Sequence, residues 1–344
     1  GYHQSNIKFK QSLFSFMTFM PPKIDLAQLP TPLQPLDRLS DRYGGPRIWI
    51  KRDDLTGCAA TGNKVRKLEF ILADVLDKRC DAVITCGGVQ SNHCRSTAIL
   101  SAQLGLKTHL VLRLDSPADN SGNLFISKLA GAGITFIEKT EYHRLDEYVE
   151  QWLHHYRDLG HQPYFIPTGG SNSLGLCGYI DALSELAVDF EKNQITPGAI
   201  IHATGSGGTQ AGLLIGCHLH SMNSEIIGFA VCDDEVYFNN KIRSEIDTWF
   251  QIQRFIMPTK LPDIQVIDKY RGPRYGACVP AVYDLIKALA RLEGIILDPI
   301  YTGKAFYGML KELERGRFDG LSDIVFIHTG GLFGLFAHNS SNSL

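Results

Sequence analysis

Short apolar segments alternate with helical segments along this chain, and this alternation constrains the fold more than any other feature of the sequence. In the first half the strand candidates are Asp81–Thr85, Thr108–Leu112 and Ile134–Ile137, and the helix candidates are Ser91–Leu104, Asn123–Ala130 and Leu145–Leu159. The pattern returns with strands at Ala199–Ala203, Ile226–Val231 and Asp323–Ile327, and helices at Tyr179–Phe190, Ala211–His220, Val279–Glu293 and Gly303–Arg315. Strands that alternate with helices predict an α/β fold with parallel sheets and right-handed crossovers.

The length and composition predict a soluble protein of two domains. The 344 residues exceed one simple core, and we expect the chain to cross between domains in the glycine-rich segment Pro163–Gly178. With 44% hydrophobic residues, 20% charged residues and a net charge of −2, neither nucleic acid nor a membrane is an expected partner. No apolar run reaches the roughly 18–20 residues of a membrane span. Residues 1–20 are set aside as a leader of unknown role.

The eight cysteines indicate an intracellular enzyme. They include no Cys-x-x-Cys pair, and Cys86 and Cys217 lie in or beside apolar segments. The same absence gives no zinc pattern, and no other metal site is expected. We therefore predict mostly buried, reduced thiols in a cytoplasmic protein.

The loop Gly205-Ser206-Gly207-Gly208-Thr209 lies between a predicted strand and an apolar helix. Glycines let the backbone approach a ligand, and the N-terminus of a helix adds partial positive charge, so this layout favours a phosphate. A dinucleotide site is the alternative, because Asp233 follows the next strand, although Gln210 stands where that fingerprint has its third glycine. A plain strand-to-helix turn would also fit the pattern.

Lys64 lies in the dense cluster Lys64, Arg66 and Lys67 at a loop-to-helix step. A solvated basic helix start is the ordinary explanation. Cations are unfavourable at the N-terminus of a helix, however, so the cluster calls for a reason. A lysine with a lowered pKa that forms an imine with an aldehyde would supply one.

Two further groups of residues are candidates for substrate contacts. Gln90, Ser91 and Asn92 follow a glycine turn at a predicted helix start, where a carboxylate could bind or an ordinary N-cap could form. Tyr275 and Tyr301 lie in turns rich in Gly and Pro, where a phenol could move protons or only cover the edge of the core.

Together these segments resemble one enzyme family, from about residue 26 to residue 336. The motifs that carry the resemblance are Lys51-Arg52-Asp53-Asp54, Gly62 to Glu69, Gly87 to His93, Gly205 to Thr209, Asp298 to Lys304 and His328-Thr329-Gly330-Gly331. Their order and content are similar to those of the D-cysteine desulfhydrase / 1-aminocyclopropane-1-carboxylate (ACC) deaminase family. These enzymes depend on pyridoxal 5'-phosphate and have the fold of the tryptophan synthase β chain, known as fold type II.

The resemblance implies two open parallel-sheet domains of three α/β/α layers and a homodimer. The large domain would comprise residues 1–66 and 177–344, and the small domain residues 67–176. Lys64 would carry pyridoxal 5'-phosphate as a Schiff base. The other implied roles are phosphate binding by Gly205, Ser206, Gly207, Gly208 and Thr209, a bond from Asn92 to the phenolate oxygen, a substrate carboxylate site at Ser91 and Gln90, and two active-site tyrosines, Tyr275 and Tyr301.

Thr302 and Thr329 favour the desulfhydrase branch. In ACC deaminases the resemblance places a glutamate and a leucine at these positions, and the glutamate bonds the pyridine nitrogen. A carboxylate keeps the pyridine protonated and the cofactor a strong electron sink, whereas a threonine hydroxyl facing that nitrogen does so far less. Loss of sulfide needs less help than opening a cyclopropane ring, so we expect D-cysteine to be the substrate.

The predicted reaction converts D-cysteine to pyruvate, hydrogen sulfide and ammonia. The substrate amine would displace Lys64, the freed Lys64 would remove the α-proton, and sulfide would leave with proton transfer assisted by Tyr275 or Tyr301. An ACC deaminase, an L-cysteate sulfo-lyase and an amino-acid racemase remain as alternatives that would use the same lysine. A catalytically silent cofactor-binding protein and a dinucleotide enzyme are the alternatives from other classes.

Overall fold

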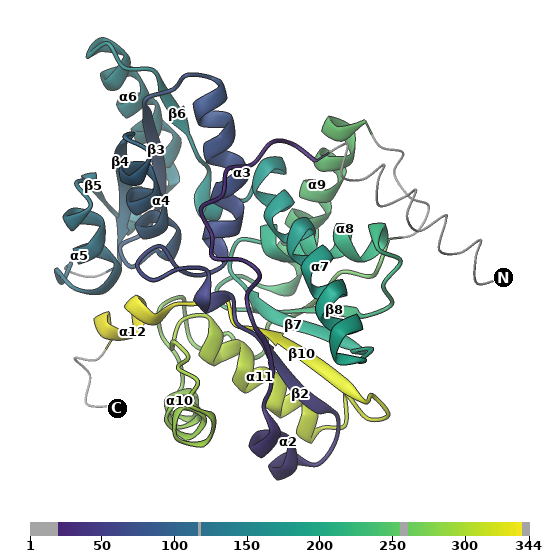
Figure 1. Cartoon of the computed structure of the whole chain (residues 1–344). Coiled ribbons are helices and arrows are strands. Elements are labelled where there is room, and N and C mark those ends of the chain that lie inside the picture. The colour runs from purple at the N-terminus through teal and green to yellow at the C-terminus, as the bar shows by residue number, and fades with distance from the viewer. Residues whose placement is uncertain (1–19, 116–117, 255–260, 339–344) are drawn as a thin grey trace.

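The computed structural model describes residues 20–115, 118–254 and 261–338, which form two sheets flanked by helices (Figure 1). The predicted leader, residues 1–20, lies almost wholly outside the described residues. Within the described ranges no helix is long and apolar enough to cross a membrane.

The larger sheet has six strands in the order β1-β2-β10-β7-β8-β9. Their bounds are β1 Leu33–Pro35, β2 Arg47–Lys51, β7 Ala199–Thr204, β8 Glu225–Ala230, β9 Gln265–Ile267 and β10 Asp323–Ile327. The edge strand β1 runs antiparallel to β2, and all other neighbours are parallel.

Both faces of this sheet are covered by helices. Ile48 and Ile50 pack into one core while Trp49 packs into the other, as the two-residue period of a strand requires. The helices on the Trp49 face are α7 Ser173–Asn193, α8 Gly208–Leu219 and α9 Glu235–Gln253, and those on the other face are α2 Asp37–Tyr43, α10 Pro280–Glu293 and α11 Thr302–Glu314.

The smaller sheet has four parallel strands in the order β5-β4-β3-β6. Its strands are β3 Ala82–Gly88, β4 Lys107–Leu114, β5 Gly133–Glu138 and β6 Pro163–Phe165. The helices α3 Asn63–Asp77, α4 Asn92–Gln103 and α5 Gly122–Leu129 pack with one face, and α6 Leu145–Asp158 with the other. The remaining elements are the 3₁₀ helices η1 Asp53–Leu55, η2 Lys139–Arg144 and η3 Thr168–Gly170, and the short helix α12 Leu332–Ala337.

The predicted α/β class with two parallel sheets is confirmed, but the segment Pro163–Gly178 differs from the prediction. It contains strand β6 and the beginning of α7, which starts at Ser173 and not at Tyr179. Gly178 lies inside this helix, where it contacts α3. A Cβ at this position would lie 2.6 Å from the backbone of Arg66, so only glycine lets α7 pack against α3 at this point. The domain boundaries at residues 67 and 176 stay a prediction.

Candidate active site

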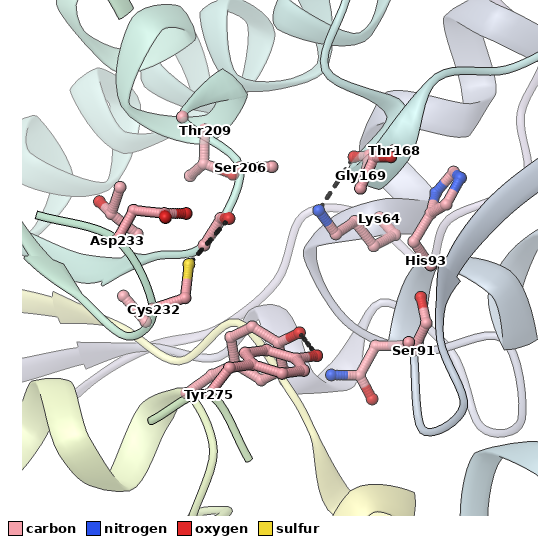
Figure 2. A pocket seen from close by; sticks show the side chains of 18 of the residues that line it. Lys64, Ser91, His93, Thr168, Gly169, Ser206, Thr209, Cys232, Asp233 and Tyr275 are labelled. Atoms are coloured by element: carbon pink, nitrogen blue, oxygen red, sulfur yellow. Dashed lines mark hydrogen bonds between the residues drawn. The ribbon is translucent and has the colours of Figure 1, made fainter. Parts of the chain in front are cut away.

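A cavity of about 560 Å³ opens where the carboxyl ends of strands from both sheets meet. Ligands of open α/β sheets bind in this position, outside the carboxyl ends of the strands. The lining comes from the start of α3, the turn between β3 and α4, the η3 segment, the loop between β7 and α8 and the C-terminal motif. Figure 2 shows Lys64 between the glycine loop on one side and Ser91 on the other.

Lys64 is the second residue of α3, and its amine lies inside the cavity lining. Its Nζ donates to the carbonyl oxygen of Gly169 at 2.9 Å. A Cβ on Gly169 would lie 3.1 Å from that amine, and its φ of +69° is a conformation suited to glycine. Burial lowers the pKa of Lys64 to about 8, which increases the fraction of the reactive neutral amine near physiological pH.

The loop between β7 and α8 meets the start of α3 directly. Asn63 Nδ2 donates to Thr209 Oγ1 at 3.2 Å, and the backbone N–H of Asn63 donates to the carbonyl of Thr329 at 3.1 Å. Gly205, Ser206, Gly207 and Thr209 line the cavity, while Gly208 begins α8 just behind them. The structure therefore brings together the three segments in which Lys64, the glycine loop and Thr329 were predicted.

A buried cation lies behind this loop. Lys67 is fully buried, and its Nζ has no hydrogen-bond acceptor among the described residues. A Cβ on Gly208 would lie 3.1 Å from that nitrogen. Burial, and next the charge of Lys64, hold the pKa of Lys67 well below its usual value. A buried amine without an acceptor is costly, and the charge of Glu245 offsets only part of that cost, so the place of Lys67 behind the glycine loop suits an anion.

These residues fit pyridoxal phosphate. The glycine loop and the N-terminus of α8 suit its phosphate, Lys67 adds a positive charge behind that loop and outside the cavity lining, and Lys64 can bond its aldehyde. A plain turn between strand and helix does not explain why an uncompensated lysine is buried beneath it.

The two predicted tyrosines form a pair at the cavity. Their hydroxyl oxygens are 2.5 Å apart, and their rings meet edge to face with centroids 5.9 Å apart. Burial raises the pKa of Tyr275 to about 12 and that of Tyr301 well above its usual value. Both groups are therefore neutral phenols at physiological pH, able to donate a proton. The Arg113 guanidinium lies 5.4 Å from the centre of the Tyr275 ring and also lines the cavity.

The start of α4 supplies polar groups on the opposite side from the glycine loop. Ser91 is the N-cap of α4, where its Oγ accepts from the backbone N–H of Cys94 at 3.1 Å, and its hydroxyl hydrogen stays available to the cavity. Asn92 also lines the cavity. Both the capping role and the position at the cavity hold for Ser91 at once.

Gln90 departs from the sequence prediction. It is not among the residues that line the cavity, and both ends of its side-chain amide are used elsewhere. Its Nε2 donates to the carbonyl of Ser121 at 3.0 Å, and its Oε1 accepts from the backbone N–H of Asn123 at 2.9 Å. The Gln90 side chain thus ties the turn before α4 to the start of α5, outside the cavity lining.

Thr302 and Thr329, the two residues that favour a desulfhydrase over an ACC deaminase, have different surroundings. Thr329 lines the cavity. Thr302 is fully buried outside the lining, and its hydroxyl donates to Asp298 Oδ1 at 2.7 Å. Asp298 also accepts from the backbone N–H groups of residues 300–302, so it fixes the turn that carries Tyr301. Of the two threonines, only Thr329 lines the cavity.

Three contributions were not found from the sequence. Lys67 was noted only as part of a basic cluster, and its missing partner is visible only in three dimensions. Arg113 gives no sequence signal, because one arginine at the end of a strand is unremarkable. The residues of η3, which place the Gly169 carbonyl on Lys64, fall in the segment that was interpreted as a junction.

Comparison with known proteins places the chain among cofactor-dependent enzymes. The family model described as "Pyridoxal-phosphate dependent enzyme" matches residues 24–330. A putative 1-aminocyclopropane-1-carboxylate deaminase of Thermotoga maritima is 41% identical over 92% of this chain and 98% of its own length. A bifunctional D-cysteine desulfhydrase/1-aminocyclopropane-1-carboxylate deaminase, mitochondrial, of Arabidopsis thaliana is 39% identical over 90% of this chain and 78% of its own length. A crystal structure of an ACC deaminase homologue superimposes with a TM-score of 0.85 at 35% identity, covering 93% of this chain and 94% of that one.

Proposed function

The chain belongs to the pyridoxal-phosphate dependent enzymes, in the branch that holds D-cysteine desulfhydrases and ACC deaminases, and on that premise we propose that it eliminates sulfide from D-cysteine. The products would be pyruvate, hydrogen sulfide and ammonia. Bound pyridoxal phosphate supplies the electron sink that stabilises negative charge at the α-carbon of the substrate. The dinucleotide alternative is set aside by this family membership.

Lys64 acts as the base in this proposal. Its Nζ would take the proton from the α-carbon of a substrate held in the cavity. The lowered pKa of about 8 supports the role, because a general base is most effective when its pKa is near the working pH. The Gly169 carbonyl, 2.9 Å away, orients the amine.

The tyrosine pair acts as the acid. Sulfide leaves the β-carbon more readily when a proton reaches the departing sulfur, and a neutral phenol can donate one. The position of both side chains in the cavity lining, with their hydroxyl oxygens 2.5 Å apart, supports this assignment. Within the pair one hydroxyl donates to the other, so one proton remains for the cavity.

The remaining assignments follow the residues around the cavity. We assign the substrate carboxylate to Ser91 and the N-terminus of α4, the cofactor phosphate to residues 205–209 with Lys67, and the phenolate oxygen to Asn92. Gln90 supports the carboxylate site from outside the cavity. The homodimer, the cytoplasmic location and the division into a large domain (1–66 and 177–344) and a small domain (67–176) are further proposals.

The observation that carries the choice of D-cysteine is the surroundings of Thr329. We assign the pyridine nitrogen to this hydroxyl. Asp298, the carboxylate that lies against Gly331, is buried, lies outside the cavity lining and is occupied by donors from the turn it fixes. A pyridine without a carboxylate partner makes a weaker electron sink, which suffices for thiolate loss better than for ring opening. ACC deamination and cleavage of L-cysteate are the alternatives.

The test measures sulfide release from D-cysteine and L-cysteine, and ammonia release from ACC, by the wild type and by Lys64→Ala. We expect sulfide from D-cysteine with wild type, and at least a thousandfold less with Lys64→Ala, since the lysine is both anchor and base. Ammonia from ACC at a rate equal to or above that of sulfide release would contradict the proposal, and so would full activity of Lys64→Ala.

A further inference from the structure

Behind Asn92 lies a short chain of buried hydrogen bonds that no predicted site includes. Arg95 and Asn123 are 0% and 1% exposed. Arg95 Nε donates to Asn123 Oδ1 at 2.9 Å. Asn123 Nδ2 in turn donates to Asn92 Oδ1 at 3.0 Å and to the carbonyl of Gln90 at 2.9 Å. The chain runs from α4 to α5 and back to the first residue of α4 at the cavity.

The chemistry at the two ends of Asn123 fixes which way its amide faces. A guanidinium only donates, so the atom beside Arg95 must be the amide oxygen. A backbone carbonyl only accepts, so the atom beside Gln90 must be the amide nitrogen. Both constraints agree, and the opposite orientation of Asn123 would lose the bonds at both ends.

The same constraint passes to Asn92. Because Asn123 donates to Asn92, the accepting atom of Asn92 must be its amide oxygen. The Nδ2 of Asn92 is then the polar atom left without a partner in this chain of bonds. Asn92 lines the cavity, and no hydrogen bond joins its Nδ2 to another of the described residues. The cavity therefore receives an N–H donor at this point and not an acceptor.

Arg95 is unusual because its buried charge has no carboxylate partner among the residues that the structure describes. Its other bonds go to the carbonyls of Ala59 at 2.6 Å and Thr61 at 3.2 Å, in the loop that leads into Lys64. Burial lowers its pKa to about 10, which still leaves it charged at physiological pH. Burying a cation without a counter-charge is costly, and the hydrogen bonds that Arg95 donates to the Lys64 loop and to Asn123 offset part of that cost.

We propose that Arg95 and Asn123 are positioning residues that hold the Asn92 amide with its NH₂ group towards the cavity, where it donates to an oxyanion of the bound ligand. This inference rests on the proposed function, under which the oxyanion is the phenolate oxygen of pyridoxal phosphate. A donor held on that oxygen stabilises the phenolate and lowers the pKa of the neighbouring Schiff-base nitrogen.

Two substitutions of Asn123 test this relay. In Asn123→Asp one carboxylate oxygen accepts from Arg95 and the other faces Asn92, whose amide must then turn its nitrogen to the carboxylate and its oxygen to the cavity. Asn123→Leu removes the relay without adding charge. The control is Thr97→Val, on the same helix and equally buried, because the Thr97 hydroxyl bonds only its own helix, at the carbonyl of His93.

The measurements are the dissociation constant of pyridoxal phosphate from the apoenzyme and the pKa of the Schiff base, read from the pH dependence of its visible absorption. For Asn123→Asp we expect binding weaker by on the order of tenfold and a pKa raised by about one unit, the value of one charge-assisted hydrogen bond. Asn123→Leu should shift both quantities in the same direction by less, and Thr97→Val should match the wild type. Asn123→Asp keeps a partner for Arg95 but loses the bond to the Gln90 carbonyl, so the thermal unfolding of each variant is measured to confirm that the apoproteins are folded under the assay conditions.

Wild-type values of both quantities in Asn123→Asp would overturn the inference, and so would a shift confined to Asn123→Asp, since charge alone would then explain it. Lys64→Ala, measured in parallel, separates this result from failure of the proposed function. If Lys64→Ala loses the visible band while the Asn123 variants match the wild type, only the relay is wrong. If Lys64→Ala keeps the band, the proposed attachment is wrong.

Discussion

Two faces of helix α3 carry buried cations, and their surroundings are opposite. Arg66 forms two bonds with Asp53, at 2.8 and 2.9 Å, and a third with Glu185 at 2.8 Å. Lys64 and Lys67, three residues apart and so on one face of the helix, have no carboxylate within ion-pair distance among the described residues. Compensated charge holds this part of the fold together, and uncompensated charge marks where a ligand belongs.

The pKa directions agree with this contrast. The paired carboxylate opposes burial on the Arg66 side, where the pKa of Arg66 is raised well above its usual value and that of Asp53 is lowered. On the other face burial dominates, and the pKa values of Lys64 and Lys67 are lowered. One helix thus combines a structural cation with two whose charge depends on a ligand.

The largest expected effect comes from breaking the compensated face. Arg66→Met leaves the buried Asp53 without its cation, while Glu185 keeps only its ion pair with Lys51, and we expect the change to destabilise the protein by about 3–5 kcal/mol. Denaturant unfolding of wild type and variant measures this directly. A loss below about 1 kcal/mol would mean that the network contributes little, and the contrast between the two faces would then fail.

A smaller effect, of a different kind, is expected from the uncompensated face. Lys67→Met should weaken the binding of pyridoxal phosphate by roughly 10- to 100-fold, because a charged donor to the phosphate is lost. The apoprotein should be as stable as wild type or more stable, since a buried amine without an acceptor is replaced by an apolar chain. Fluorescence titration of the apoprotein and its denaturant unfolding check the two parts, and unchanged cofactor affinity would contradict the role of Lys67.

The smallest effect is a pH dependence of the apoprotein. The folded pKa of Lys64, about 8, lies below the usual 10.5, so the unfolded chain binds more protons between these values and stability should rise as pH increases through this window. The full pKa shift would correspond to a change of about 3 kcal/mol in the free energy of unfolding. Partial contact of the Lys64 side chain with solvent reduces the expected change to roughly 1–2 kcal/mol.

The matched variant for this prediction is Lys64→Met. Its apoprotein should be more stable than wild type near pH 7 and should show a smaller rise between pH 8 and pH 10, because Lys304, whose pKa burial also lowers to about 8, still contributes to the rise. Urea unfolding at several pH values provides the comparison. An identical rise of stability in both proteins would assign the rise to groups other than Lys64. Tyr275 is not one of them, because its raised pKa affects stability only above that pH window.

The sequence predicted the fold well where local patterns agree with tertiary packing. The alternating strands and helices of both sheets are examples, since their apolar periodicity is also their packing pattern. It failed at residues 163–178, where helix α7 tolerates Gly175 and Gly178 because the backbones of Gly170 and Arg66 approach too closely for any side chain. Strand β6 was missed because it has three residues and starts with a proline.

The candidate site shows the same division. The motifs around Lys64 and the glycine loop carry strong local signals, and the structure brings these segments together. The missing partner of Lys67, the displacement of Gln90 from the cavity and the relay through Asn123 all depend on contacts between separate elements. No local pattern encodes such contacts, so they could not be predicted from one sequence.

The central claim is that the Lys64 amine is bonded covalently to pyridoxal phosphate. The most direct measurement is borohydride reduction of the purified protein, which would make that bond permanent, followed by proteolysis and mass spectrometry of the peptides. We expect the added mass of the reduced cofactor on the peptide that contains Lys64, and on Lys64 itself. An unmodified Lys64 with the cofactor attached to another lysine would contradict the account.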